Sequence, residues 1–210
     1  MLLYMGMFDL SREEKILFKK LSTPIKIQDF LDTLPINFEK KGETYLSPRR
    51  VIRENKAHCM EGALFAAAAL WVHGQPPLIL DLKALSPDLD HVVALYKINN
   101  RWGAISKSNH STLRFRDPVY KTVRELVMSY FHEYFINKTG KKTLVSFSRP
   151  FNLKKLGKSW ITEEKDLWDI VYDLDASPHE DIYTGKTRFF IRKADKMEVR
   201  AGKLLEWRAS

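Results

Sequence analysis

One segment of this chain, HCMEGALFAAAALWVHG from His58 to Gly74, limits the possible folds more than any other. It is apolar on nearly every side and rich in strong helix formers, above all alanine, and Gly74 stands where helices commonly end. The sequence therefore predicts a helix over His58–His73. Its alanine run lets a neighbouring element approach closely, which favours a central helix packed on a sheet over one that faces solvent.

Patterns on either side of this helix predict a mixture of helices and strands. Ser11 followed by Glu14 has the pattern of a capping box, and apolar spacing and breakers predict helices at Ser11–Lys20, Ile27–Leu34, Thr122–Phe135 and around Glu163–Leu174. Runs of β-branched and apolar residues predict strands at Leu78–Leu82, His91–Ile98, Arg101–Lys107 and Leu144–Ser148, with further candidate strands at Arg188–Ile191 and Lys196–Val199. Asn99-Asn100 predicts a two-residue hairpin turn, and Phe38–Val51 reads as a long loop.

Length and composition exclude several classes of protein. With 210 residues we expect a single domain, 1–210, having a core at about 22–150 and a C-terminal extension, 151–210, packed on it. No apolar run approaches the ~20 residues of a membrane span, and the opening MLLYMGMFDL lacks a basic leader, so we expect a cytoplasmic protein without a membrane partner. The net charge of +9 is scattered among acidic residues, so nucleic acid is not the expected partner. Oligomeric state stays open.

The single cysteine, Cys59, excludes an internal disulfide and thiolate metal clusters. No HExxH motif or glycine-rich phosphate loop occurs either, so we expect no metal and no cofactor. Cys59 instead stands at the start of the predicted helix, where unpaired amides and the helix dipole stabilise a thiolate. The same amides can hold the oxyanion that forms when a thiolate attacks a carbonyl group. A small buried hydrophobic cysteine is the alternative interpretation.

His91, which opens a predicted strand, is the candidate base for Cys59. His58 is adjacent in sequence, but neighbouring helical residues point in different directions, so we do not expect His58 to pair with the thiol. The same geometry turns Glu61 away from Cys59, toward the surface or a supporting role. A third group should orient the imidazole. Given a two-residue hairpin loop, Ser106 and Ser108 share the face of His91, and a one-residue slip would select Asn109 instead.

These segments carry a resemblance. HCMEGALFAAAAL, then LILDL, DHVVALYK and WGAISKSN, spanning Asn55 to about Asn109, resemble the core of transglutaminase-like proteins, the rearranged relatives of papain-like cysteine proteases. RDPVYKTVRELVMSYFHEYF further resembles bacterial proteins with this domain. The resemblance implies an α+β fold, a papain/transglutaminase-like core in which a central Cys-bearing helix packs on an antiparallel sheet.

The resemblance also implies roles for particular residues. Cys59 and His91 match the family's nucleophile and base. Ser106 stands where the family usually has Asp, and Asn109 or Asp117 are the other candidates for that third position. Relatives supply a second oxyanion donor from the region upstream of the cysteine, where this sequence has Tyr45, Arg50 and Asn55.

Two functions follow as expectations. The first is a cysteine-dependent amide hydrolase or acyl transferase (a peptidase, deamidase or transglutaminase-like enzyme) that acts through a thioester on a peptide, protein or small amide. The second is a catalytically weak or inactive binding module for a peptide or small ligand, which Ser106 in place of Asp favours.

Overall fold

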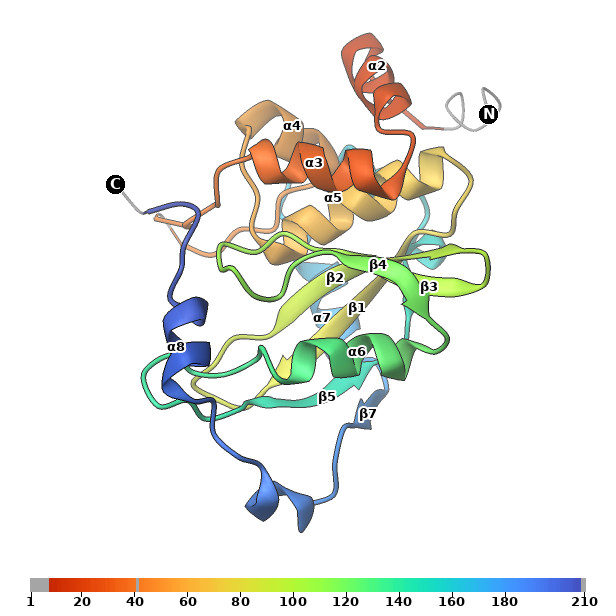
Figure 1. Ribbon diagram of the computed structural model, residues 1–210. Helices are drawn as coiled ribbons and strands as arrows, with labels where there is room; N and C mark the ends of the chain where they lie inside the picture. Colours follow the sequence, from red (N-terminus) through yellow and green to blue (C-terminus); the bar gives the residue numbers. More distant parts are fainter. Residues whose placement is uncertain (1–7, 41, 209–210) are drawn as a thin grey trace.

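The structure is a computed structural model in which residues 8–40 and 42–208 are described. It is a mixed α+β fold with a twisted sheet at its centre (Figure 1). The α-helices are α2 (Arg12–Lys20), α3 (Pro24–Thr33), α4 (Pro48–Glu54), α5 (Cys59–Val72), α6 (Val123–Phe131), α7 (Trp168–Asp175) and α8 (Lys196–Gly202). The strands are β1 (Leu78–Ala84), β2 (His91–Ile98), β3 (Arg101–Ile105), β4 (Arg116–Tyr120), β5 (Leu144–Ser148), β6 (Phe151–Asn152) and β7 (His179–Asp181). Three 3₁₀ turns are η1 (Leu153–Leu156), η2 (Ser159–Ile161) and η3 (Thr187–Phe190).

The sheet runs in the order β4-β3-β2-β1-β5-β7, with β6 also paired to β1, and the pairings are antiparallel. Alternate side chains of its central strands enter different cores. Ile79 and Ala94 pack in the core that contains α5, whereas Leu80 and Val93 pack in the one that contains α6. Helices therefore cover both faces of the sheet (Figure 1). The expected α+β class, with a Cys-bearing helix packed on an antiparallel sheet, is confirmed.

Helix α5 is the buried centre of the molecule. Every residue from Met60 to Val72 is buried, as its apolar sequence predicts. Gly62 permits a close approach on its first turn, because a Cβ added there would lie 2.5 Å from Cβ of Lys107. This contact fixes the N-terminal turn of α5 against the chain that follows β3, where the candidate site residues lie.

Gly62→Ala is expected to lower the free energy of unfolding by about 1–2 kcal/mol, because overpacking against Lys107 outweighs the better helix propensity of alanine. Urea unfolding measures the difference. Gly185→Ala is the matched control, since a Cβ at Gly185 meets open space and should leave stability within about 0.5 kcal/mol. An unchanged urea midpoint for Gly62→Ala would show that the two segments can move apart.

The hairpin register agrees with the sequence analysis. Ile98 pairs with Arg101, and both Asn99 and Asn100 have positive φ, 48° and 58°, as a two-residue type I′ turn requires. The second strand is shorter than expected, since β3 ends at Ile105 rather than Lys107. The chain leaves the ladder there, and the residues after Ile105 form a loop beside α5.

Several predicted elements were wrong. The expected loop Phe38–Val51 contains the start of α4, because Ser47 caps the helix by accepting from the Arg50 amide and Pro48 occupies its first turn. The candidate strand Arg188–Ile191 lies in η3 and its C-cap residue, Ile191. The candidate strand Lys196–Val199 belongs to α8, which Asp195 caps together with Glu198. The helix expected around Glu163–Leu174 begins only at Trp168.

Within the described ranges, no helix has the length and apolar character that crossing a bilayer requires. Residues 1–7, which belong to the opening segment used to predict the absence of a leader, lie outside the described residues.

Candidate active site

Cys59 is the first residue of α5 and is only half-buried. It borders a cavity of about 360 Å³ that His91, Lys107, Asn109 and Tyr134 also line. His58, the N-cap residue, accepts hydrogen bonds from the amides of Met60 and Glu61. No hydrogen bond occupies the Cys59 amide within residues 8–40 and 42–208. A free amide therefore stands beside the thiol, at the positive end of the helix.

His91 belongs to a directional chain of hydrogen bonds. The Ser106 hydroxyl donates its single proton to the Leu113 carbonyl oxygen at 2.5 Å, so its oxygen accepts from Nε2–H of His91 at 2.8 Å. This fixes the imidazole tautomer and leaves Nδ1 with a lone pair. His91 is 6% exposed and Ser106 is 2% exposed, so water competes little for these bonds. Nδ1 is the ring nitrogen left to take a proton from Cys59.

Gln28 of α3 holds Ser106 in place. Its Oε1 accepts from the Ser106 amide at 2.9 Å, and its Nε2 donates to the Ser106 carbonyl oxygen at 2.8 Å. Gln28 is buried, and the two residues are 78 positions apart in sequence. Helix α3, from the N-terminal part of the chain, therefore sets the position of the Ser106 hydroxyl beside His91.

The surroundings of Cys59 favour its thiolate. Burial acts to raise the pKa of the thiol, but hydrogen bonds with His58 and His91 and the charge of their rings outweigh burial and hold that pKa well below its ordinary value. Burial lowers the pKa of His58, yet Cys59, Glu61 and the Thr44 carbonyl together raise it to about 9. The site thus favours the thiolate of Cys59 more than an ordinary cysteine environment does.

His58 helps to lower the pKa of Cys59, although the sequence analysis expects no pairing between the two residues. That expectation assumed that both residues are helical, whereas His58 has extended backbone angles, φ −97° and ψ −172°. Its ring turns back over the first turn of α5, where Nδ1 accepts from Met60 and Nε2 contacts the Thr44 carbonyl at 2.8 Å. Nδ1 of His58 cannot accept from the Met60 amide and donate to the Cys59 sulfur at the same time. A hydrogen bond from Nδ1 to the thiolate would therefore replace the bond that caps α5.

Glu61 has no exposed surface, contrary to the surface placement that the sequence analysis left open. Its carboxylate accepts from the backbone amides of His58 and Leu46 at 2.9 and 3.0 Å, and from the side chains of Asn37 and Thr44. Burial raises its pKa, with these hydrogen bonds acting in the opposite direction. Glu61 therefore ties the segment 37–46 to the turn that carries Cys59.

The remaining candidates for the third group lie elsewhere. Asn109 lines the cavity, but its side-chain amide exchanges two hydrogen bonds with the backbone of Trp207 at 2.8 and 3.0 Å. The Ser108 hydroxyl donates to the Thr112 carbonyl, and Asp117 is exposed on β4, the edge strand. Among these candidates only Ser106 is hydrogen-bonded to His91.

Of the three residues considered as a second oxyanion donor, Tyr45 alone lines a cavity with Cys59. Arg50 binds Asp166 and Glu54, and Asn55 ends α4 in the left-handed conformation. Burial and the neighbouring charges of Glu43 and Glu39 raise the pKa of Tyr45 to about 12, so its hydroxyl keeps the proton needed to donate.

This second cavity, of about 400 Å³, lies between the α5 N-terminus and α7. The side chains of Tyr45 and Trp168 meet edge to face, with ring centroids 4.6 Å apart. Five carboxylates also line it: Glu39, Glu43, Asp81, Asp90 and Asp175. The wall beside the thiol is therefore acidic and aromatic in a chain whose net charge is positive.

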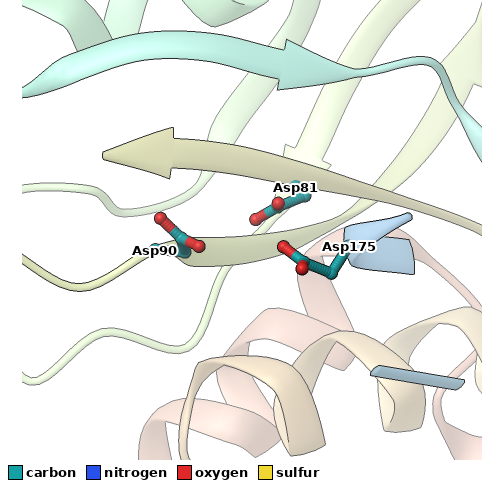
Figure 2. Close-up of side chains that lie close together, drawn as sticks. All are labelled: Asp81, Asp90 and Asp175. Atoms are coloured by element: carbon teal, nitrogen blue, oxygen red, sulfur yellow. The ribbon is translucent and has the colours of Figure 1, made fainter. Parts of the chain in front are cut away.

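Three of those carboxylates, Asp81, Asp90 and Asp175, point toward one another (Figure 2). One oxygen of each lies within 4.8 Å of the others. Lys83 binds both Asp90 and Asp175, and His179 contacts Asp81 at 3.1 Å. Burial, with the charge of Asp90, raises the pKa of Asp81 to about 6 despite the His179 bond. Lys83 thus brings positive charge to the group, and His179 adds a hydrogen-bonding partner for Asp81. The sequence analysis missed this group because its members are far apart in the chain.

Comparisons with known proteins give a limited result. No protein-family model matches the chain, and no curated protein matches it. Among solved structures, the chain is similar to Legionella pneumophila LapG (EGTA-treated), with 13% identity and a TM-score of 0.41, over 70% of this chain and 84% of LapG. At this level of likeness, a functional assignment has to come from the residues of the site.

Proposed function

We propose that this protein is a cysteine-dependent amide hydrolase or acyl transferase whose nucleophile is Cys59 and whose base is His91. The observation that carries the proposal is the chain of hydrogen bonds from Leu113 through Ser106 to His91, together with the lowered pKa of Cys59 at the start of α5. The resemblance of residues 55–109 to transglutaminase-like proteins supports the same assignment. Substrates are amides: a peptide, a protein side chain or a small carboxamide.

In the first step, the Cys59 thiolate adds to the carbonyl carbon of the substrate amide. The oxyanion accepts hydrogen bonds from the Cys59 amide and the Tyr45 hydroxyl. The C–N bond then breaks, and the leaving amine takes the proton from Nδ1 of His91, which leaves a thioester on sulfur. Water, deprotonated by His91, attacks the thioester, the C–S bond breaks, and the acid and the Cys59 thiolate are released. Where an amine takes the place of water, the same step gives a new amide. Ser106 orients the ring throughout by accepting from Nε2–H.

The rate of Cys59 alkylation by iodoacetamide, followed by mass spectrometry against pH, tests the pair. In the native protein we expect the rate to stay high at neutral pH and to fall only as pH drops through the lowered pKa, with a midpoint well below the ordinary thiol value near 8.5. His91→Ala should move the midpoint upward and slow alkylation at neutral pH by about tenfold or more.

Two further variants make this result specific. His58→Asn keeps an N-cap acceptor for α5 but removes the imidazole, so it measures the share of the shift that comes from His58. His132→Ala, at an exposed position, is the control and should leave the profile unchanged. If Cys59 is alkylated slowly at neutral pH and His91→Ala does not change that rate, the proposed enzymatic activity is contradicted.

That contradictory result would favour the second function, a binding module that uses the same cavities for a peptide or small ligand. The observation in its favour is Ser106, because a hydroxyl cannot balance an imidazolium by charge as a carboxylate does.

A further inference from the structure

The segment between β7 and α8 projects from the lower end of the molecule (Figure 1). At its end lies η3, where Phe189 and Phe190 are each 87% exposed. All residues from Thr184 to Phe190 are exposed. Contact of two adjacent phenylalanine rings with water is unfavourable in free energy. A second surface that covers the rings explains why such a pair lies at the projecting end.

The same segment, residues 184–194, is strongly basic. It contains four cations, Lys186, Arg188, Arg192 and Lys193, and no carboxylate. These residues are exposed, with the Arg192 side chain at 78%. The nearest acid in the sequence is Asp195, which meets Arg192 only at 3.8 Å and caps α8. The segment that carries the two phenylalanine rings therefore contains only positively charged ionic side chains.

The base of the projection is fixed to the fold. Ile191 and Tyr183 pack against the core of the α6 face of the sheet, and the Tyr183 ring meets Phe131 edge to face at 6.1 Å. The Ala194 amide donates to the Gly140 carbonyl oxygen at 2.8 Å. Backbone hydrogen bonds from Thr187 to Thr184 and from Phe189 to Lys186 shape the turn itself. The two rings are thus held outward by an anchored support.

We propose that residues 184–193, here named the Phe-Phe tip, dock on the surface of an anionic lipid membrane. Phe189 and Phe190 enter the boundary between headgroups and acyl chains, while the four cations face the phosphate and carboxylate groups of the lipids. Charge complementarity argues for this occupant. A convex tip also suits a soft lipid layer, which requires no matching groove. The expectation of no membrane partner rests on the lack of a spanning segment and on basic residues that are scattered among acidic ones over the whole length, and neither feature addresses a short surface segment.

Co-sedimentation of the full chain with lipid vesicles tests the proposal. The native protein is expected to bind vesicles of phosphatidylcholine with a minor fraction of phosphatidylserine, to bind vesicles of phosphatidylcholine alone much less, and to be released as salt screens the charges. The double variant Phe189→Ser/Phe190→Ser should bind anionic vesicles at least about tenfold more weakly. Arg188→Glu/Arg192→Glu should remove the preference for anionic lipid.

Matched controls come from elsewhere on the surface. Ile25 on α3 is 61% exposed, and Lys19 and Lys20 end α2, so Ile25→Ser and Lys19→Glu/Lys20→Glu change similar chemistry away from the tip. These variants should bind vesicles within about twofold of the native protein, apart from a small charge effect. Thermal unfolding should be unchanged in all the tip variants, because the altered side chains are exposed.

Three results would overturn the proposal. They are failure of the native protein to bind anionic vesicles at low salt, equal binding by the phenylalanine double variant, and concentration-dependent self-association that the double variant abolishes without any vesicle binding. The last result would mean that the rings meet a second copy of the chain. None of these measurements uses Cys59, so the outcome is independent of the proposed activity.

Discussion

Glu61→Ala is expected to lower the free energy of unfolding by about 3–5 kcal/mol, more than a capping residue usually contributes. The carboxylate is fully buried and serves four donors. Its removal leaves the amides of Leu46 and His58 without an acceptor in a buried region, and the Asn37 side chain keeps only its bond to the Thr44 hydroxyl. Urea or thermal unfolding followed by circular dichroism measures the loss.

The chain provides a close control for this variant. Glu125 occupies the same third position of a capping box, with Thr122 as N-cap of α6, but it is exposed. Glu125→Ala should therefore cost only about 0.5–1 kcal/mol. Similar losses for the two variants would show that burial does not increase the contribution of Glu61. A loss confined to Glu61→Ala should be accompanied by slower alkylation of Cys59 at neutral pH, because His58 and the segment 37–46 lose their common anchor.

Lys107→Ala is expected to lower the free energy of unfolding by about 3 kcal/mol. Lys107 is 1% exposed, and its ammonium donates to the carbonyl oxygens of Leu31 and Leu34, 2.8 and 2.5 Å away, at the C-terminal end of α3. The variant leaves the Leu34 carbonyl unpaired, leaves the Leu31 carbonyl with only its bond from the Leu34 amide, and opens a void beside Gly62. Thermal unfolding of the native and variant proteins measures the difference.

The pH dependence of Lys107→Ala has a definite sign. Burial lowers the pKa of Lys107, so between that lowered value and the ordinary value near 10.5 the unfolded chain binds more protons than the folded chain. The stability of the native protein therefore gains a contribution as pH rises through this window, and Lys107→Ala should lack it. Lys97→Ala, at an exposed lysine over the Trp102 ring, should cost about 0.5 kcal/mol without this dependence. Equal losses of stability for Lys107→Ala and Lys97→Ala, with the same pH dependence, would contradict a buried ammonium at Lys107.

Features fixed by local chemistry could be predicted from the sequence. The helix over residues 58–73 follows from its helix-forming residues, and the hairpin register follows from Asn99-Asn100. That register places Ser106 on the face of His91, and the structure shows the two side chains hydrogen-bonded. The two wrongly assigned strands near the C-terminus are four residues each, with only a few apolar side chains, and this signal was too short to separate a strand from a 3₁₀ turn or from the start of a helix.

Features that depend on long-range contacts could not be predicted. Gln28 is far from Ser106 in sequence, and nothing in the residues around it signals a role at His91. The contribution of His58 to the pKa of Cys59 was missed for a different reason. The residue stands at a boundary where the backbone changes from extended to helical, and a shift of one position decides whether its ring faces the thiol.

The hydroxyl that orients His91 has a consequence under acidic conditions. An aspartate in that position would be protonated as pH falls, and it would then lose both its charge and part of its hold on the imidazole. Ser106 does not titrate in this range, and its one proton is committed to the Leu113 carbonyl oxygen. The ring therefore keeps the same acceptor on Nε2 in acid as at neutral pH, so acid inactivation would not arise from loss of the group that orients His91.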